Sequence, residues 1–513
     1  MSQHTRKTRT FNVSLLLVLH LALVLPLSYF LNIWADEAST LHATQQGFWN
    51  AFQTAAAEQK QAPLYFWVLS LWRHINDSIF FARLFSIICS LAAIKLFAGL
   101  AGRLFSPSTA LLVTAFFALH PFLIWASLEI RVYSLVILLS VVLIRLFFDA
   151  FWDDMRPDPN RGFKYLKVWF LFAVIAALYT NYYLGFLLVA MFAALILTGK
   201  WRRIVVYLGL MALAAIAFLP LVLELRTEFL AKTGGFQEER SLIEGLRSIW
   251  NHILTFVLPT EIFPGEVQSI FSAIRVWLVR LAIAVVAVMA IRNRKNLTKN
   301  TLALAAITVV VGIFFLTAYF LLGNPYVEIR HASVLFVPMI LFTTSLIVDV
   351  FKDIGARAAR TASIAFGLLV LISFSYSLTT LYPNMTKRGD WARVGEFIRQ
   401  NESPGQPILV FTTFEALALP YHYNGINQIL PNEKFFTFAP EAAFGSADSL
   451  VRETEFVISE IPPEATQMWL AVSEKCLNTK ACIPLQNYVK ANYTIKIEKE
   501  FYLEKLYLLK RKP

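Results

Sequence analysis

Charged residues are scarce in this chain: Asp, Glu, Lys and Arg make up only 16% of its 513 residues. Ordinary soluble domains carry about 25%, whereas hydrophobic residues here reach 57% and the mean hydropathy is +0.57. This composition argues against a soluble globular enzyme, and it excludes a disordered chain and a collagen-like repeat. Three cysteines are too few for a disulfide-rich secreted scaffold. The composition therefore indicates an integral membrane protein.

The sequence also lacks the common nucleotide and metal motifs. It has no GxxxxGK[ST] loop, no GxGxxG turn, no HExxH and no CxxC. ATP-driven pumping, dinucleotide chemistry and zinc proteolysis therefore have no support, and we expect no cofactor and no metal. The net charge of +12 would fit nucleic-acid binding in a soluble protein. Here the basic residues cluster between apolar stretches, as in cytoplasmic loops, so we expect no nucleic-acid partner.

Long apolar stretches predict the membrane topology, because a helix needs about 20 apolar residues to cross the bilayer core. We predict about eleven spans. They begin near Phe11, Ile79, Ala110, Val132, Val168, Leu184, Ile204, Ile270, Thr301, Ala332 and Thr361. With a cytoplasmic N-terminus, every basic loop then falls on the cytoplasmic side. Residues 168–197 could form one long helix, but basic clusters flank them on both sides, so we divide them at 181–183.

The chain is predicted to have two domains. Residues 1–381 form a transmembrane domain with long outer loops at 32–78 and 224–268, and residues 382–513 are polar enough to form an extracytoplasmic α/β domain. In that second domain the pattern predicts an amphipathic helix at 390–400 and strands at 407–411, 468–472 and 501–509.

The cysteines fit this organisation. Cys476 and Cys482 share a loop of the outer domain, where a disulfide is permitted; two free thiols are the alternative. Cys89 lies inside the second span and is interpreted as a small apolar residue. The sequence ends without an endoplasmic-reticulum retention signal, which fits a multi-pass protein of a bacterial inner membrane.

Two adjacent acids are the first candidate site. Asp36 and Glu37 follow Trp34 directly after the first apolar stretch. Polar residues can simply end a helix at the membrane surface. Two carboxylates side by side near the bilayer, however, repel each other and lose hydration, which raises the basicity of one of them. Such acids are enriched at working sites, so we take both as candidate catalytic residues.

A second polar group lies between the third and fourth spans, on the same predicted face. It contains Glu129, Arg131 and Tyr133. Glu129 and Arg131 could pair with each other, or Arg131 could hold a phosphate, because an isolated charge is costly at this depth. Snorkelling is the ordinary explanation for the other arginines near this face, which are Arg83, Arg275, Arg280 and Arg330. Acids and cations on one face are the combination that a phosphate leaving group and a hydroxyl nucleophile require.

Residues 60–72 are short, aromatic-rich and amphipathic, which predicts a helix lying in the membrane interface with Lys60 at headgroup level.

The order of these motifs resembles the membrane glycosyltransferases of the GT-C fold, in particular bacterial relatives of the protein O-mannosyltransferases and the aminoarabinose transferases. The resemblance is best over residues 1–190 and returns near Arg330-His331 and Asp390-Trp391. It is carried by Trp-Ala-Asp-Glu-Ala at 34–38, Pro-Leu-Tyr at 63–65, Leu-Trp at 71–72, Phe-Phe-Ala-Arg-Leu-Phe-Ser at 80–86, and His-Pro-Phe followed by Glu-Ile-Arg-Val-Tyr within 120–133.

The resemblance implies a polyprenyl-phosphate sugar as donor, used outside the cytoplasm, with inversion at the anomeric carbon and a mannosyltransferase-like activity. Asp36 matches the family's catalytic acid and would deprotonate the acceptor hydroxyl, with Glu37 in support. Glu129 and Arg131 would line the site or hold the donor phosphate. The family often has His or Lys followed by Pro-Pro where this chain reads Gln-Ala-Pro at 61–63, so Lys60 would be the residue that serves the phosphate.

Two other interpretations stay open. A polytopic transporter or lipid flippase would also be basic on its cytoplasmic side, although transporters tend to place polar residues at the middle of the membrane. A ligase or polymerase acting on a pyrophosphate-linked glycan would keep the fold class and change the donor. The partners expected for the glycosyltransferase are membrane lipids, the lipid-linked donor and a hydroxyl acceptor on a protein, lipid or glycan.

Overall fold

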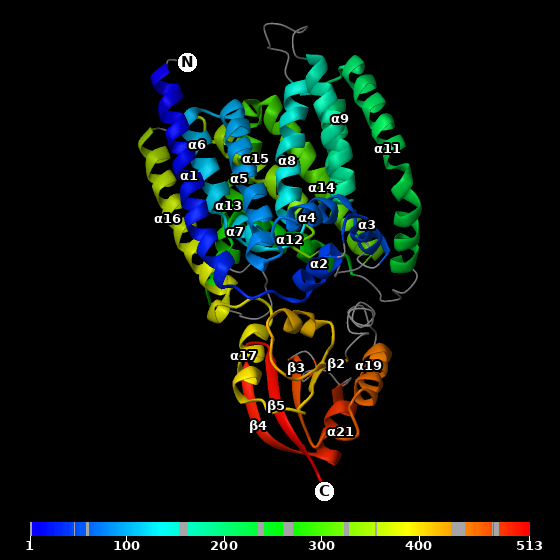
Figure 1. Ribbon diagram of the computed structural model, residues 1–513. Helices are drawn as coiled ribbons and strands as arrows, with labels where there is room; N and C mark the ends of the chain where they lie inside the picture. Colours follow the sequence, from blue (N-terminus) through cyan, green and yellow to red (C-terminus); the bar gives the residue numbers. More distant parts are fainter. Residues whose placement is uncertain are drawn as a thin grey trace. The chain divides into compact units, whose positions relative to one another are not determined.

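Apolar helices and one small sheet make up the computed structural model of the chain (Figure 1). The structure describes residues 3–45, 47–57, 61–152, 163–233, 241–259, 270–322, 328–353, 356–431, 447–473, 476 and 482–513. Contacts divide the chain into two units. The helical unit comprises Met1–Ser28 and Ala55–Leu381, and the sheet unit comprises Tyr29–Thr54 and Tyr382–Pro513.

The predicted membrane spans are helices. Within the described residues, eight helices are long and apolar enough to cross a membrane. They are α1 (Gln3–Phe30), α5 (Ile79–Leu104), α8 (Tyr133–Phe147) with the π-helix η1 (Phe148–Trp152), α11 (Trp201–Thr233), α13 (Ile270–Arg292), α14 (Lys299–Leu322), α15 (Ser333–Val350) and α16 (Ala356–Leu381). The pair α6 (Pro107–Leu119) and α7 (Pro121–Leu128) is long and apolar enough only when taken together, and it is bent by 47°. Helices α9 (Phe163–Thr180) and α10 (Leu184–Ile196) are shorter and apolar. All the predicted stretches coincide with these helices.

Local hydrogen bonds explain the two breaks between consecutive apolar helices, one between α9 and α10 and one between α6 and α7. Between α9 and α10, Asn181 accepts a hydrogen bond from the backbone of Tyr183 through its side-chain oxygen at 2.9 Å, which stabilises a turn where we divided residues 168–197. Between α6 and α7, the His120 side chain caps α7 by accepting from the Phe122 amide at 3.1 Å, with Pro121 at the first helical position.

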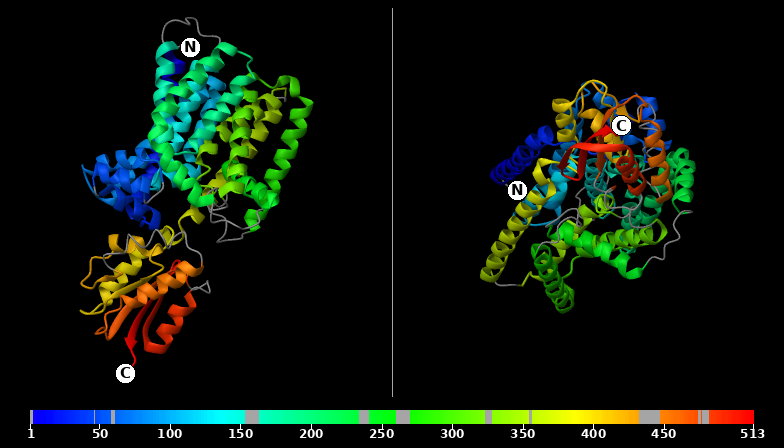
Figure 2. Two further views of the ribbon diagram at one scale, coloured as in Figure 1. Left: turned by 90° about the vertical axis from the view of Figure 1, so that its right-hand side faces the viewer. Right: turned by 90° about the horizontal axis from the view of Figure 1, so that it is seen from below.

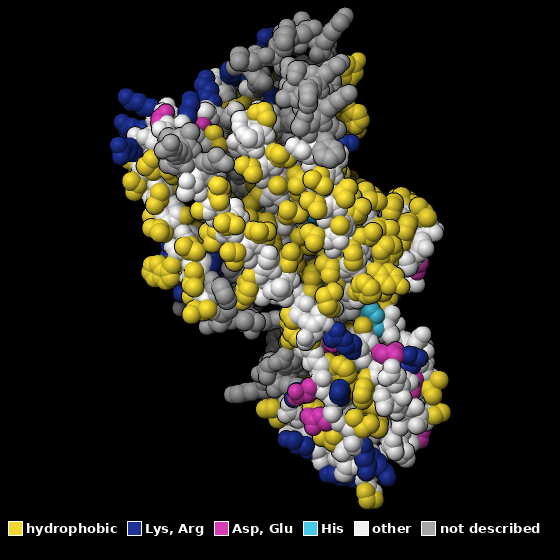
Figure 3. All heavy atoms as spheres, turned by 90° about the vertical axis from the view of Figure 1, so that its left-hand side faces the viewer, with side chains coloured by type: hydrophobic (Ala, Val, Ile, Leu, Met, Phe, Trp, Pro, Cys, Tyr) yellow, Lys and Arg dark blue, Asp and Glu magenta, His cyan; other side chains and the backbone are white. Residues whose placement is uncertain are grey.

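Aromatic stacking fills the interior of the helical unit. Phe97 of α5 stacks on Phe117 of α6 with ring centroids 4.2 Å apart, and Phe186 of α10 stacks on Phe314 of α14 at 4.8 Å. The helices run side by side as a bundle in Figures 1 and 2. Apolar side chains cover its flank, and Lys and Arg gather near one end (Figure 3). An apolar flank of this kind is what a lipid-facing surface requires.

Short helices occupy the two predicted loops. The first loop contains α2 (Ala35–Gln45), α3 (Phe48–Ala57) and α4 (Leu64–Arg73), the last of which covers most of the predicted interfacial helix. The second contains α12 (Leu242–Val257), which packs on α14: Tyr319 donates to Glu244 at 3.2 Å. A 3-10 turn, η2 (Arg294–Asn296), joins α13 to α14.

In the described part of the sheet unit, five strands form a sheet in the order β2-β1-β3-β5-β4. Strand β1 is parallel to β2 and β3, and β5 is antiparallel to β3 and β4. The strands are β1 (Ile408–Phe411), β2 (Ile429–Leu430), β3 (Gln467–Ser473), β4 (Tyr493–Phe501) and β5 (Glu504–Arg511). The helices are η4 (Pro383–Met385), α17 (Trp391–Asn401), η5 (Glu415–Tyr421), α19 (Ala447–Ser459) and α21 (Ile483–Asn492). The predicted C-terminal α/β domain is therefore present.

Both faces of the sheet are covered. Leu470 of β3 packs with Val457 of α19 and Leu485 of α21, in the same core as the disulfide between Cys476 and Cys482. Trp469, its neighbour in the strand, contacts Phe397 of α17 at 6.2 Å between ring centroids. Because successive strand residues point to opposite faces, α17 covers the face away from α19 and α21.

The sheet unit also includes Tyr29–Thr54, from the other end of the sequence. We assigned this segment to the transmembrane domain from the sequence, whereas its contacts are with the C-terminal part. The Ile33 amide donates to Nε2 of His422 at 3.2 Å, and the Tyr421 hydroxyl donates to the Ala38 carbonyl at 3.4 Å. Helix α2 is thus built into the sheet unit.

Candidate functional site

Asp36 and Glu37 lie in the first turn of α2. Trp34 precedes the helix, and its amide donates to Oε2 of Glu37 at 3.4 Å while its carbonyl accepts from Ala38 at 3.0 Å. This is half of a capping box, which explains why an acid sits at the third helical position. Both carboxylates also lie in the first turn of the helix, the usual position for acidic side chains because the helix dipole is positive there. Local helix chemistry therefore accounts for the position of the acidic pair.

The two acids differ in their surroundings. Glu37 is fully buried, and its Oε1 accepts from Nζ of Lys387 at 2.7 Å; the Lys387 side chain is only 2% exposed. Asp36, one residue earlier, is half-buried. A buried carboxylate needs a counter-charge, and Lys387 supplies it. The charge of Glu37 is thus neutralised and held in place, and Asp36 is the more accessible carboxylate of the pair.

Asn32 fixes the segment that carries Lys387. Its Oδ1 accepts from the Lys387 amide at 2.7 Å and from the Thr386 hydroxyl at 3.0 Å, and its Nδ2 donates to the Gly389 carbonyl. Next to it, the Arg388 guanidinium lies 4.9 Å from the centre of the Trp34 ring, a cation–π contact. Residues on both sides of Asp36 are therefore bound to the segment 386–389.

Asp390 follows this segment and is buried, which raises the pKa of its carboxyl group; the ion pair with Arg393 at 2.8 Å acts in the opposite direction. The Asp390 amide donates to the buried Glu504 carboxylate. The Asp390-Trp391 motif therefore begins α17 and connects it to β5 through a hydrogen bond, so the role of this motif is structural.

In the helical unit, Glu129, Arg131 and Tyr133 share the turn between α7 and α8. All three are buried, with Arg131 at 7% exposure. Tyr133 stacks on Trp125 with ring centroids 4.9 Å apart, and the Ser86 hydroxyl of α5 donates to the Glu129 carbonyl at 2.6 Å. Arg83 lies one turn before Ser86 in α5, so the structure brings Arg83, Glu129, Arg131 and Tyr133 into one region of this unit.

Arg83 is completely buried and donates through NH1 to the Ser28 carbonyl of α1 at 2.9 Å. Arg330 lies before α15 and forms an ion pair with Glu328 at 2.8 Å. Lys60 lies outside the described residues. Among the described residues, no cluster of three His, Cys, Asp or Glu side chains could hold a metal ion.

A buried histidine supports the turn at Glu129, and the sequence analysis missed it. Nδ1 of His20 in α1 lies 2.6 Å from the Ala118 carbonyl, and its Nε2 lies 3.2 Å from the Ser90 hydroxyl and 3.1 Å from the Ser127 hydroxyl. These contacts join α1, α5, α6 and α7. A histidine inside an apolar span is a signal of a polar cluster, and it could have indicated this one.

Lys387 is the other residue that the sequence analysis missed. It lies 350 positions from Glu37, so no local period could connect them. The available signal was the basic pair Lys387-Arg388 directly before the Asp390-Trp391 motif.

Known proteins resemble this chain in part of the sequence and in the whole fold. Residues 60–223 match the family described as dolichyl-phosphate-mannose-protein mannosyltransferase. No curated protein matches the sequence significantly. The crystal structure of ArnT from Cupriavidus metallidurans in the apo state superimposes with a TM-score of 0.56 at 13% identity, covering 96% of this chain and 97% of ArnT.

Two structures with bound lipid are also similar. ArnT from Cupriavidus metallidurans bound to undecaprenyl phosphate gives a TM-score of 0.55 at 13% identity, again over 96% and 97% of the two chains. The archaeal oligosaccharyltransferase AglB from Archaeoglobus fulgidus, in complex with an inhibitory peptide and a dolichol-phosphate, gives 0.51 at 12% identity, over 99% of this chain and 74% of AglB.

Residues 60–223 therefore match a mannosyltransferase family model, and the chain shares the fold of ArnT and AglB, which is of the GT-C type. The fold class predicted from the order of motifs is confirmed.

Proposed function

We propose that the protein transfers a sugar from a polyprenyl-phosphate donor to a hydroxyl acceptor on the non-cytoplasmic side of the membrane, with Asp36 as the general base. The observation that carries this proposal is the difference between the two acids: Glu37 is buried against Lys387, and Asp36 is half-buried in the same turn. A base that takes a proton from a substrate must be reachable.

In the proposed reaction, the Asp36 carboxylate takes the proton of the acceptor hydroxyl. The acceptor oxygen forms a bond to the anomeric carbon, and the bond from that carbon to the phosphate oxygen breaks. Polyprenyl phosphate leaves with the electron pair. Direct displacement inverts the anomeric carbon, and a positioned base contributes about 10²–10⁴-fold.

The donor is supported by the comparisons. ArnT binds undecaprenyl phosphate and AglB binds a dolichol-phosphate in structures that share this fold. We propose that Arg131 and Arg83 of the helical unit bind the donor phosphate, because a guanidinium matches the geometry of phosphate oxygens. Glu129, Tyr133, Lys60 and Arg330 are proposed as further donor-site residues.

The test is sugar transfer by purified full-length protein from a panel of labelled polyprenyl-phosphate sugars, with Asp36→Asn beside the wild type. We expect the variant to lose about 10²–10⁴-fold in rate while it still binds the donor. Glu396→Gln is the matched control, since Glu396 and its partner Arg399 are 49% and 48% exposed, and it should leave the rate unchanged.

Three outcomes would count against the proposal. Full activity in Asp36→Asn would exclude Asp36 as the base. Transfer from a polyprenyl-pyrophosphate sugar alone would indicate the ligase or polymerase interpretation. Lipid translocation in reconstituted vesicles, without transfer from any donor, would favour the transporter.

A further inference from the structure

A buried polar cluster joins four helices of the helical unit, and His20 of α1 lies at its centre. His20 is 0% exposed. Its Nδ1 lies 2.6 Å from the Ala118 carbonyl of α6, and its Nε2 lies 3.2 Å from the Ser90 hydroxyl of α5 and 3.1 Å from the Ser127 hydroxyl of α7. The four helices can be followed in Figure 1. Polar side chains are costly inside an apolar bundle and usually serve a function there. The cluster is therefore a candidate for a role in the reaction.

The contacts determine the direction of each hydrogen bond of the His20 ring. A carbonyl oxygen can only accept, so Nδ1 carries a hydrogen and donates it to Ala118. Nε2 of the neutral ring is then an acceptor, and one of the two serine hydroxyls donates to it. One side chain of α1 therefore contacts α6 through one ring nitrogen and α5 and α7 through the other.

These contacts lie on both sides of the bend between α6 and α7. The two helices are bent by 47° at a break formed by His120 and Pro121. Ala118 lies in the last turn of α6, before the break, and Ser127 lies in the last turn of α7, after it. A change in the direction of α7 would lengthen at least one of the two hydrogen bonds. His20 thus holds the bent pair in one geometry.

The end of α7 leads directly into the turn that carries Arg131. Serines of two other helices attach this turn to its neighbours. The Ser86 hydroxyl of α5 donates to the Glu129 carbonyl at 2.6 Å, and the Ser134 hydroxyl of α8 donates to the Ala126 carbonyl at 2.5 Å. Because the turn is bound at both ends, a shift of α7 would move Arg131 with it.

The same face of α5 carries the other arginine proposed for the donor phosphate. Arg83, Ser86 and Ser90 follow one another at intervals of three and four residues, which places them on one side of the helix. Arg83 donates to the Ser28 carbonyl of α1 at 2.9 Å. Helix α1 therefore contacts this face of α5 at two levels, through Ser28 and through His20.

We propose that His20 is a positioning residue of the donor site: by holding α7 through Ser127, it sets the place where Arg131 meets the donor phosphate. This inference rests on the proposed function, in which Arg131 and Arg83 bind that phosphate. His20 does not touch the donor, so its replacement should weaken donor binding and leave the chemical step unchanged.

The test measures binding of undecaprenyl phosphate to the purified full-length protein in detergent micelles by native mass spectrometry. His20→Asn keeps an amide near the position of Nδ1 and is too short to reach Ser127, whereas His20→Gln places its amide near the position of Nε2. We expect the affinity of His20→Asn to fall about 3–10-fold, the effect of one hydrogen bond between membrane helices. His20→Gln should bind like the wild type.

Ser127→Ala examines the same contact from its other side. It should lose the same factor in affinity, and the double variant His20→Asn/Ser127→Ala should lose little more, because both changes remove one contact. If the His20 variants do not fold, as judged by their gel-filtration profiles, Ser127→Ala alone decides, and an affinity equal to that of the wild type would refute the proposal.

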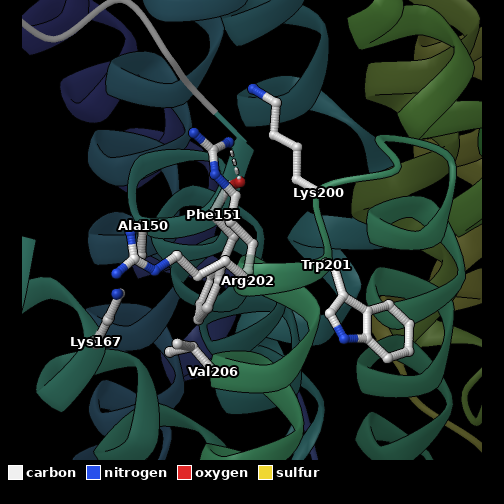
Figure 4. Close-up of a pocket in the computed structure, with 8 residues that line it drawn as sticks. Ala150, Phe151, Lys167, Lys200, Trp201, Arg202 and Val206 are labelled. Atoms are coloured by element: carbon white, nitrogen blue, oxygen red, sulfur yellow. Dashed lines mark hydrogen bonds between the residues drawn. The ribbon is translucent and has the colours of Figure 1, made fainter.

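The matched control is Tyr207→Phe, which removes a buried hydrogen bond between two other helices, from the Tyr207 hydroxyl of α11 to the Leu188 carbonyl of α10 at 2.8 Å. Tyr207 follows Val206, which lines a cavity with residues of η1, α9 and the start of α11 (Figure 4). None of these elements contributes to the His20 cluster. The control should therefore bind undecaprenyl phosphate like the wild type.

Kinetics distinguish positioning from a general loss of structure. With a sugar donor that the wild type uses, the KM of His20→Asn for that donor should rise by the same factor as the loss of affinity, while kcat stays within about twofold. A merely structural role would reduce the active fraction, and thus kcat, at an unchanged KM.

Three results would overturn the proposal. These are wild-type affinity in His20→Asn, an equal loss in His20→Asn and His20→Gln, and an equal loss in Tyr207→Phe. A wild type that does not bind undecaprenyl phosphate would overturn the proposed donor and this role with it. A wild type that binds the lipid and transfers no sugar would overturn the proposed reaction alone, since binding is measured without transfer.

Discussion

Replacing Lys387 with methionine should loosen the loop that carries Asp36. Methionine retains the length of the side chain and removes its charge. In the wild type, Nζ of Lys387 lies 2.7 Å from Oε1 of Glu37, and both side chains are at most 2% exposed. The Trp34 amide, which donates to Oε2 of Glu37 at 3.4 Å, is a neutral group and does not replace the lost positive charge.

The expected cost follows from this burial. Removing one partner of a buried ion pair leaves an uncompensated charge and typically costs about 3–5 kcal/mol. If this cost falls on the local opening of α2, it lowers the hydrogen-exchange protection of the α2 amides by about 10²–10⁴-fold. Hydrogen exchange with mass spectrometry measures this in peptides from α2 and from residues 382–391 of the full-length protein.

Two controls make the result specific. Lys505→Met removes the partner of Glu500 in a pair that is 32% and 68% exposed, so solvent already screens it and exchange in α2 should not change. The double variant Glu37→Gln/Lys387→Met removes both charges, so it should be less destabilised than the sum of the two single variants. Unchanged protection of α2 in Lys387→Met would refute the inference that this ion pair holds the loop.

Two further predictions concern the sheet unit. The variant Cys476→Ser/Cys482→Ser removes a disulfide between residues six positions apart. Chemical unfolding should show that the free energy of unfolding falls by about 2 kcal/mol, and reductant should cause the same loss in the wild type. Equal stability of the wild type with and without reductant would contradict this prediction. Burial raises the pKa of the Glu453 carboxyl group, while the hydrogen bonds from Thr413 act in the opposite direction. The folded state therefore binds a proton at Glu453 more tightly than the unfolded state does. The contribution of Glu453 to the free energy of unfolding consequently falls as the pH rises. Glu453→Gln should therefore stabilise the protein at pH 7, and this gain should disappear as the pH falls through the raised pKa toward the unfolded value of about 4.3; a gain that is independent of pH would exclude Glu453 as its source.

Hydropathy alone was sufficient for the membrane helices, because a span must be apolar over its whole length. The sequence also located the break at 181–183, the buried apolar strands β1 and β3, and β5 through its apolar run at 506–509. It missed the two-residue strand β2 and also β4, whose sequence Tyr-Thr-Ile-Lys-Ile-Glu-Lys-Glu-Phe is mostly exposed at the edge of the sheet. Charged residues on such an edge prevent it from pairing with another chain, and they also mask the apolar pattern by which a strand is predicted from sequence.

The candidate site was predictable only where its signal was local. Asp36 and Glu37 stand out because they are adjacent acids after an apolar stretch, and Arg131 because it is a charge between two spans. The ion pair of Glu37 with Lys387 and the polar cluster around His20 depend on contacts between distant segments. No periodicity encodes them, so the roles of Asp36 and Glu37 were distinguished only by the family resemblance and not by the residues themselves.

The pairing of residues 350 positions apart has a consequence for synthesis of the chain. Helix α2 is translated before nearly all of the membrane helices, yet Lys387, Gly389 and His422, which bind its flanks, are made after them. Contacts of such long range form late, since the intervening chain must be in place first. A truncated chain that stops after α16 would contain Asp36 without the residues that position its loop. We therefore expect the loop that carries Asp36 to be held in place only when the last quarter of the protein has been made.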